Sequence, residues 1–451
     1  MKKFIETVKN IFSIEELRTR IVNTLLLLAV FRVGTFIRIP GVDKLILDDI
    51  NNASGGAKGL LGLIDTFAGG AFERASIFAL GIMPYISASI VVQLLTIAVP
   101  SFQKMSKEGE DGRRKMNQIT RYLTIAITAV QAFSYLINFQ NTKGAAIMPG
   151  MSPGLFMFSA VCVLVAGTMF TMWLGERITD RGLGNGISLI IMVGIISQLP
   201  TALLAEVASK FGGAGGPIFF VIEMVIWLLV ILSVILLVQG TRRIPVQYAK
   251  RIVGNRQYGG VRQYLPLKVN AAGVMPIIFA QALMFIPASV SGLFADNPSM
   301  AGVFNSFADF TSFGYNALFF VMIVLFTYFY TAITINPTQI SDDLKRNGGF
   351  IPGVKPGKAT ANFVDSIMSR ITLPGAIFLG FVSIFPAFAV IGGANTQFAQ
   401  FFGGTSLLIL VGVVLDTLQQ VESHLMMRHY DGLMKGGRIK GRTSSGGTIT
   451  G

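Results

Sequence analysis

Apolar residues gather in long runs along the whole chain, and short polar segments separate these runs. A helix needs about 20 residues to cross roughly 30 Å of hydrocarbon, and ten runs approach that length. The pattern therefore predicts ten transmembrane helices, the fifth of which is short and rich in glycine at its start. The ten runs are 21–37, 76–99, 119–139, 155–174, 184–199, 217–239, 270–290, 314–335, 372–391 and 404–421.

The polar segments predict how the ten helices are oriented. The first 20 residues mix charged and apolar positions and lack the apolar core of a signal peptide, so we expect an amphipathic surface helix there. Ten spans place both termini on one side, and Lys and Arg are enriched in cytosolic loops. A cytosolic N-terminus assigns 30 of the 37 Lys and Arg residues to the cytosolic side, 6 to the external side and Arg32 to the first span. Both termini are therefore expected in the cytosol.

Ten spans also divide into two sets of five. Because five is odd, the second set enters the membrane from the opposite side, which is the topology of an inverted repeat with a site between the halves. Parity alone indicates this repeat, since the halves show no sequence identity to each other. The expected segments are an N-terminal segment 1–20, a first half 21–200, a second half 201–424 and a tail 425–451.

Residues 60–72 are apolar but too few to span a bilayer. They include Asp65 and the adjacent pair Gly69 and Gly70, and they are too apolar to lie freely in water. We expect a short re-entrant helix buried in protein, with the glycines as a hinge that lets it move. A helix lying on the outer leaflet is the alternative.

The second span carries a stripe of isoleucines. Ile82, Ile86 and Ile90 recur every four residues and so share one helix face. Pro84 removes a backbone hydrogen bond and is expected to kink this helix. Such a stripe usually serves packing or lipid contact, and the functional alternative is a hydrophobic constriction that gates a pore by excluding water.

Two cytosolic loops are longer and more basic than topology requires. Loop 240–268 holds seven Lys and Arg residues and no acidic residue, and loop 336–371 holds five Lys and Arg residues. The positive-inside bias accounts for part of this charge. Long basic loops at a membrane surface can also dock an acidic partner, RNA included.

Composition supports a membrane protein without catalytic chemistry. The chain is 52% apolar and 13% charged, with a mean hydropathy of +0.62, which excludes a soluble, disordered or fibrous protein. Its one cysteine, Cys162, forms neither an intrachain disulfide nor a cysteine zinc site. The two histidines, His424 and His429, lie near the C-terminus, so an interior site that depends on histidine is excluded.

The spans themselves carry few charges. Arg32, Glu223 and Asp416 lie near span ends, where we expect them to be satisfied at the membrane interface. The sequence contains no Ser-His-Asp arrangement, no phosphate-binding loop and no metal-ligand set. A conduit or a binding scaffold is favoured over an enzyme, and no cofactor is expected.

Five stretches, spread over both halves, resemble the SecY family of protein-conducting channels. They are residues 74–89, 107–115, 173–188, 265–270 and 402–409. The resemblance implies an all-α multi-pass protein of the cytoplasmic (inner) membrane, built as a clamshell of two inverted five-helix halves with a movable plug. It implies a channel subunit, not an enzyme, that passes unfolded secretory proteins across the membrane and releases membrane helices laterally into lipid.

The resemblance also assigns roles to individual residues. The implied pore ring, a waist of apolar side chains, is Ile82, Ile86, Ile190, Ile278 and Ile409. The implied plug residues are Leu61, Leu63, Ile64, Asp65, Phe67, Gly69 and Gly70. The implied lateral gate, between the second and seventh spans, includes Ser87, Gln93, Asn270 and Gln281. The residues implied to dock the ribosome or a motor are Arg242, Arg243, Lys250, Arg251, Arg256 and Lys355.

The implied partners are the small membrane subunits SecE and SecG, the motor ATPase SecA, the ribosome through its RNA, signal sequences, nascent polypeptides and the lipid bilayer. Lys355 departs from the family, which usually has arginine there, and lysine lacks the planar multi-donor group of arginine. We therefore expect motor docking to be weaker or differently built. A secondary transporter of a small substrate, and an insertase or scaffold without a pore, are the alternative interpretations.

Overall fold

The computed structural model describes residues 14–54, 60–148, 152–211, 216–248, 251–253, 256–258, 262–291 and 311–436. Residues 1–13 of the expected surface helix and residues 437–451 of the tail lie outside these ranges. The longer helices are α2 (Glu15–Gly34), α5 (Met83–Ala98), α7 (Glu110–Lys143), α8 (Pro153–Arg181), α9 (Gly186–Phe211), α10 (Gly216–Gln239), α11 (Met275–Ser291), α13 (Phe313–Thr334), α15 (Lys358–Ile391) and α17 (Gly404–Gly436). The shorter ones are α3 (Lys44–Ser54), α4 (Leu60–Ala68), α6 (Pro100–Lys107), η1 (Gly144–Ala146), α14 (Pro337–Arg346) and α16 (Thr396–Ala399).

Each of the ten predicted spans coincides with one of the longer helices, from α2 to α17. Within the described residues, seven of these helices are long and apolar enough to cross a membrane, or eight if α5 and α6 form one bent span. The two that fall short are α2, whose first turns are charged, and the apolar part of α11, Met275–Met284. The helices are therefore consistent with ten spans, and the count of ten stays a prediction.

The second span differs from its expected form. Its helix, α5, begins at Met83, and Pro84 lies in the first turn rather than in the middle. Proline is tolerated there because the first N–H groups of a helix have no partner within the helix. The expected kink at Pro84 is therefore wrong. The sharp bend comes at the other end of the helix, where α5 and α6 meet at 104°.

The fifth span is longer than the apolar pattern indicated. It was expected to end at 199, but α9 continues through Pro200 to Phe211. This last part carries Glu206 and Lys210, whose charges hid it from a search for apolar runs. Both side chains are buried, at 0% and 4% exposure, and they pair with each other.

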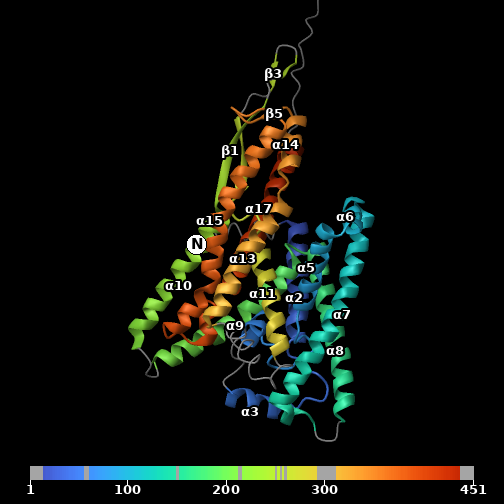
Figure 1. Ribbon diagram of the computed structural model, residues 1–451, viewed down its shortest axis with the longest axis vertical. Helices are drawn as coiled ribbons and strands as arrows, with labels where there is room; N and C mark the ends of the chain where they lie inside the picture. The colour runs from blue at the N-terminus through green and yellow to red at the C-terminus, as the bar shows by residue number, and fades with distance from the viewer. Residues whose placement is uncertain are drawn as a thin grey trace, which may run out of the picture.

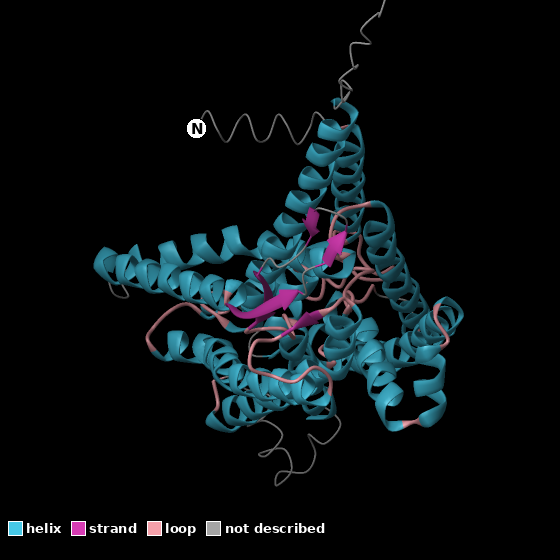
Figure 2. Cartoon of the chain, turned by 90° about the horizontal axis from the view of Figure 1, so that it is seen from above, coloured by secondary structure: helices cyan, strands magenta, loops and turns pink. Residues whose placement is uncertain are grey.

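Three clusters of buried side chains hold the helices together. One lies within the first half, between residues 39 and 164, and another within the second half, between residues 234 and 411. The third is central and takes side chains from α2, α5, α9, α11 and α17, so it joins the two halves. Viewed from above, the strands lie near the middle of the picture and the helices lie around them (Figure 2).

A small strand platform extends from one end of the helices (Figure 1). Strand β1 (Thr241–Tyr248) pairs antiparallel with β4 (Arg262–Lys268) and with β5 (Gly349–Phe350), while β2 (Arg251–Val253) pairs with β3 (Arg256–Tyr258). Both long basic loops therefore fold into one unit. Its own apolar core includes Ile244, Val246, Leu267, Leu344, Ile351, Val364 and Met368.

Candidate pore, plug and gate

The five isoleucines of the expected pore ring lie in one cluster. Ile82 precedes α5, and the other four come from α5, α9, α11 and α17, so both halves contribute. All five are buried, between 1% and 7% exposed. Helices far apart in the sequence thus bring side chains of one chemical type to one place.

A small cavity marks the centre of this cluster. Three of the expected ring residues, Ile86, Ile278 and Ile409, line it, and Phe67 of α4 also reaches it. The cavity leaves only about 10 Å³ for the centres of water molecules, room for at most one water. The cavity is also lined by Gln281, which was expected at the lateral gate, and by Met83, Ile191 and Thr405, to which the sequence assigned no role of their own.

The short apolar segment forms helix α4, which packs against α9. Gly69 and Gly70 end the helix, because both adopt positive φ angles, +68° and +84°, that other residues rarely adopt. Gly194 of α9 lies so close that an added Cβ would be 2.4 Å from the Phe67 carbonyl oxygen. The expected re-entrant helix thus packs directly against α9, the fifth predicted span. The side chains of Leu61, Leu63 and Ile64 lie outside the described part.

Three polar contacts hold α4 in place. The Arg32 guanidinium donates to the Gly69 carbonyl at 2.8 Å, and the Gln198 amide donates to the Asp65 carboxylate at 3.1 Å. These two contacts stay within the first half. The Thr66 hydroxyl donates to Gln400 at 2.6 Å and so connects α4 to the second half.

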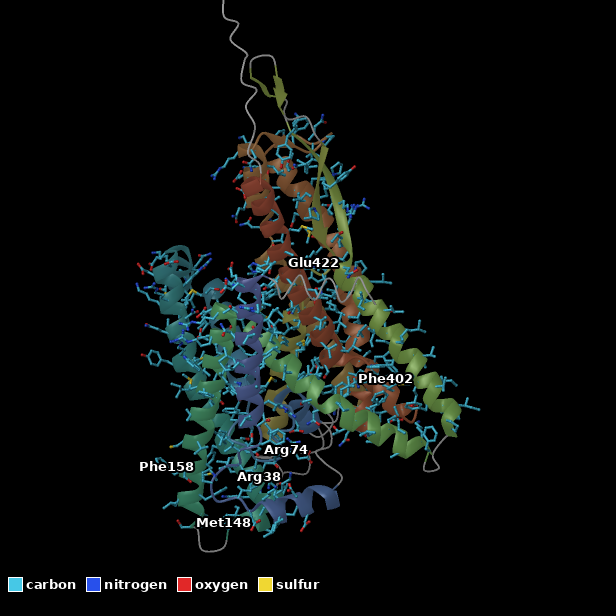
Figure 3. All side chains as sticks on the ribbon, turned by 180° about the vertical axis from the view of Figure 1, so that it is seen from behind. Arg38, Arg74, Met148, Phe158, Phe402 and Glu422 are labelled. Atoms are coloured by element: carbon cyan, nitrogen blue, oxygen red, sulfur yellow. The ribbon has the colours of Figure 1, made fainter. Side chains whose placement is uncertain are left out.

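Asp65 is a buried carboxylate in this plug helix, 6% exposed. Burial raises the pKa of Asp65 to about 6, and the nearby Glu73 charge acts in the same direction. The backbone N–H of Glu73, which donates to Asp65 at 2.9 Å, and the charge of Arg74 act against this shift. Arg74 and Arg38 lie toward the end of the molecule opposite the strand platform (Figure 3).

Helices α5 and α11, which carry the expected lateral gate, pack against each other. On α5, the Ser87 hydroxyl donates to the Met83 carbonyl and the Gln93 amide to Ser89, so both bond within their own helix. Gln281 on α11 is 2% exposed and lines the pore-ring cavity. The two helices that carry these residues are thus in contact, and their role as a gate stays a prediction.

Asn270, the fourth expected gate residue, lies in the turn before α11 and lines a wide opening on the platform side. This opening has about 500 Å³ of space for water and is bordered by Asn185, Lys268, Asp416 and Gln420, among others. Asp416, expected at the membrane interface, thus faces an aqueous funnel between the halves.

The expected docking residues are spread over the strand platform. Arg242 and Arg243 are exposed on β1, and Lys355 is exposed in the turn between β5 and α15. Lys250 lies outside the described residues, as do the side chains of Arg251 on β2 and Arg256 on β3. The alternation of buried Ile244 and Val246 with exposed neighbours is a strand signal that the search for apolar runs missed.

A buried group of charges went unnoticed in the sequence. The Lys210 ammonium is 2.7 Å from the Glu223 carboxylate and 3.6 Å from that of Glu206. Lys210 also donates to the Gly393 carbonyl, and the Asn395 N–H donates to Glu206. Glu223 was expected at the membrane interface, but it belongs to this triad, which joins α9, α10 and the segment before α16.

These features define a multi-pass helical membrane protein in which two sets of helices meet at an apolar constriction with a short plug helix against it. The SecY family profile matches residues 76–418. A protein translocase subunit SecY of Halalkalibacterium halodurans is 45% identical over 436 residues, covering 95% of this chain and 99% of the relative. That of Thermus thermophilus is 45% identical over 434 residues, covering 95% and 97%. The chain belongs to the SecY family.

Solved structures show the same fold at low sequence identity. A structure described as a protein conducting channel matches with a TM-score of 0.64 at 17% identity, covering 94% of this chain and 95% of the other. Sec61 in a canine ribosome-channel complex matches with a TM-score of 0.57 at 16% identity, over 94% and 95%. The resemblance found in the sequence motifs is confirmed: the chain is a protein-conducting channel subunit, not an enzyme. The transporter and scaffold alternatives are not supported.

Proposed function

We propose that this chain forms the pore through which unfolded secretory proteins cross the cytoplasmic membrane of its cell, with both termini in the cytosol. The observation that carries this proposal is the central cluster, in which isoleucines of both halves surround a cavity with room for one water at most. Isoleucine side chains can adapt to varied polypeptides. They offer no ligands to replace the hydration shell of an ion, so ions meet a dehydration barrier.

Helix α4 is proposed to act as a plug that adds a second barrier. Phe67 reaches the isoleucine cavity, and the polar contacts of Arg32, Asp65 and Thr66 hold the helix in place. The neutral bond of Thr66 is worth about 1 kcal/mol net, and the bonds of the charged groups Arg32 and Asp65 are worth about 1.5–3 kcal/mol each. A passing polypeptide can therefore displace the plug without unfolding the helices around it.

The seam between α5 and α11 is proposed as the lateral gate. A signal sequence is an apolar helix that prefers lipid, and it can replace helix–helix contacts along this seam. Its stronger binding to the open state would shift the population toward opening. Membrane helices would leave for the bilayer by the same route, past Ser87, Gln93 and Gln281.

The strand platform is proposed to receive the ribosome or the SecA motor. Its exposed Arg242, Arg243 and Lys355 provide the positive charge that an RNA or an acidic protein surface would meet. The ribosome-bound relative supports the first partner. Lys355 contributes a point charge where arginine would bind bidentately, so we expect its contacts with the motor to be weaker. SecE and SecG are the proposed small membrane subunits.

A disulfide crosslink tests whether the substrate passes the isoleucine ring. Cys162 is replaced, Ile86→Cys is introduced, and a stalled secretory chain carries one cysteine at its middle. We expect a crosslink that requires the signal sequence. The same cysteine at Leu228, an exposed position on α10, is the control and should not crosslink. If Ile86, Ile278 and Ile409 all fail to crosslink while the chain is engaged, the pore assignment is wrong.

Charge reversal tests the docking platform. Arg242→Glu with Arg243→Glu should lower motor-driven translocation and ribosome binding severalfold, because both side chains are exposed on β1. The matched control reverses Arg113 and Arg114, two exposed residues of α7 that lie outside the platform. Equal translocation by both double variants at equal expression would contradict a docking role for β1.

A further inference from the structure

A second cavity lies behind the isoleucine ring, inside the second half of the molecule. It is enclosed by α11, α13, α15 and the start of α17, and its lining includes Gln281, Tyr315, Ser383, Gln400 and Thr405. Gln281 and Thr405 also line the pore-ring cavity, so these two residues form the partition between the two spaces. Among the lining residues that the structure describes, there is no Lys, Arg, Asp, Glu or His.

Polar groups without a protein partner face this space. Among the described residues, the Nε2 of Gln281, the hydroxyl of Tyr315 and the hydroxyl of Ser383 are buried and make no hydrogen bond of ordinary geometry, although the side chains of Gln281 and Tyr315 lie close to each other. Their residues are 2%, 3% and 6% exposed, so bulk solvent does not reach them. Buried polar groups in proteins are almost always hydrogen-bonded, and three orphans around one cavity indicate a shared ligand.

A proline interrupts the backbone hydrogen bonding of α15 beside the cavity. Pro386 lines the cavity from inside the helix and has no N–H to donate to the carbonyl of Val382, one turn earlier. Gly403 approaches that carbonyl closely, since a Cβ there would be 2.6 Å from the Val382 oxygen. The helix is continuous here but lacks one backbone hydrogen bond at the level of the cavity.

We propose that this cavity is a binding site for one or two ordered water molecules, which bridge Gln281, Tyr315 and Ser383. Its size fits this ligand: about 20 Å³ is open to the centres of water molecules, and one water needs about 10–15 Å³. The neutral lining favours a neutral ligand over an ion. Three converging donors and acceptors match the two to four partners that a buried water normally has. On the side of α11, the isoleucine ring then lies next to a part of the protein that contains bound water.

Radiolytic labelling tests the site, because hydroxyl radicals formed from a bound water oxidise the side chains beside it even where bulk solvent is excluded. The purified channel in lipid nanodiscs is exposed to a short X-ray pulse, and oxidation of Tyr315 is compared with that of Tyr135. Tyr135 is the matched control: it is buried, at 8% exposure, and its hydroxyl donates to the Phe72 carbonyl. We expect Tyr315 to be oxidised severalfold faster than Tyr135.

Two variants at Ser383 separate hydration from general loosening. Ser383→Val fills the space and should bring Tyr315 oxidation down to the level of Tyr135, whereas Ser383→Ala keeps the space and should retain most of it. Oxidation of Tyr315 no faster than that of Tyr135 in the unaltered protein would overturn the proposal. So would unchanged Tyr315 oxidation in Ser383→Val. If Ser383→Val misfolds, the oxidation of Tyr135 rises as well. The test then rests on the comparison of Tyr315 with Tyr135 in the unaltered protein.

Discussion

Gly194 sets the distance between the plug helix and the wall on which it rests. Its missing side chain lets the Phe67 carbonyl approach α9, and an added Cβ would be 2.4 Å from that oxygen. Both atoms belong to backbone or to a short side chain, so the clash cannot be relieved by a rotamer change. The absence of a side chain at Gly194 therefore allows α4 to pack closely against α9.

Gly194→Ala is expected to displace the plug and raise the ion conductance of the resting channel in planar bilayers. The control is Gly154→Ala on α8, where an added Cβ meets nothing within 4 Å. Resting conductance equal in the two variants would show that α4 does not seal the pore through its contact with α9.

Asp65 makes the seat of the plug sensitive to pH. Its pKa is raised to about 6 in the seated plug and should return toward 3.8 when the plug leaves and the carboxyl meets water. The seated state therefore favours the protonated form. The stabilisation of the seated plug by protonated Asp65 is fully present below about pH 4 and is lost as the pH rises through 6. This loss amounts to on the order of 3 kcal/mol.

Resting conductance should consequently increase between pH 5 and pH 8, and Asp65→Asn should remove most of this increase. Asparagine keeps an oxygen that can accept from the Glu73 N–H, so the seat itself is preserved. Glu73, Arg74, Tyr135 and Lys143 also lie close enough to feel the Asp65 charge or to act on it. A pH profile that is the same with and without Asp65 would assign the dependence to those neighbours.

At the scale of elements, α4 is held by contacts of two kinds. Arg32 and Gln198 hold it to the first half, whereas Thr66 donates to Gln400 in the second half. Because this bond joins α4 to the second half, separation of the halves would stretch it. This bond therefore couples the position of the plug to the separation of the halves.

Thr66→Val keeps the shape of the side chain and removes the donor. We expect about 1 kcal/mol less stability of the seated plug, or about a fivefold increase in its released population. Cysteine crosslinking of the plug to α9 can measure that population. The control, Thr142→Val, removes a hydroxyl that bonds only within its own helix. Equal crosslinking in both variants would refute the coupling.

The strand platform is also an element that depends on distant contacts. Gln247 and Tyr248 of β1 pair with Phe350 and Gly349 of β5, about a hundred residues further along the chain. The positive charge of both loops was visible in the sequence, but their joining into one sheet was not. Considered one at a time, the two loops would be expected to form separate structures. The pairing of β1 with β5 instead joins them into one surface that a partner can contact.

At the scale of the whole molecule, the triad of Glu206, Lys210 and Glu223 pins the end of α9, a helix that begins in the first half, to α10 and to the segment before α16. It holds two carboxylates and one ammonium, all largely buried, so the triad carries an excess negative charge when all three are ionised. Removal of the ammonium would leave two buried carboxylates facing each other without compensation.

Lys210→Met should therefore destabilise the protein by about 3–5 kcal/mol, seen as a lower thermal midpoint in detergent or a loss of accumulation. Glu223→Gln should cost far less, because Lys210 and Glu206 remain a neutral pair and the amide oxygen can still accept from Lys210. If the two variants unfold at the same temperature, the charge of Lys210 does not stabilise the contact between α9 and α10.

The sequence by itself determined where the helices lie, and it predicted which side of the membrane carries the cations. It also showed the isoleucine stripe of the second span, whose role in a pore ring came from the family resemblance. These features follow from local hydropathy and charge, and long motifs such as residues 74–89 and 173–188 indicated the family. Hydropathy works locally because lipid acts on each span separately.

Only the tertiary structure decided the start of α5 at Met83, the extension of α9 through Pro200, the buried charge triad and the bond between Thr66 and Gln400. The bond between Thr66 and Gln400 and that between Lys210 and the Gly393 carbonyl join residues far apart in the sequence. A charge such as Lys210 indicates a loop when it is considered alone, and it becomes part of a buried helix only because two carboxylates from separate helical turns and a distant carbonyl are folded around it.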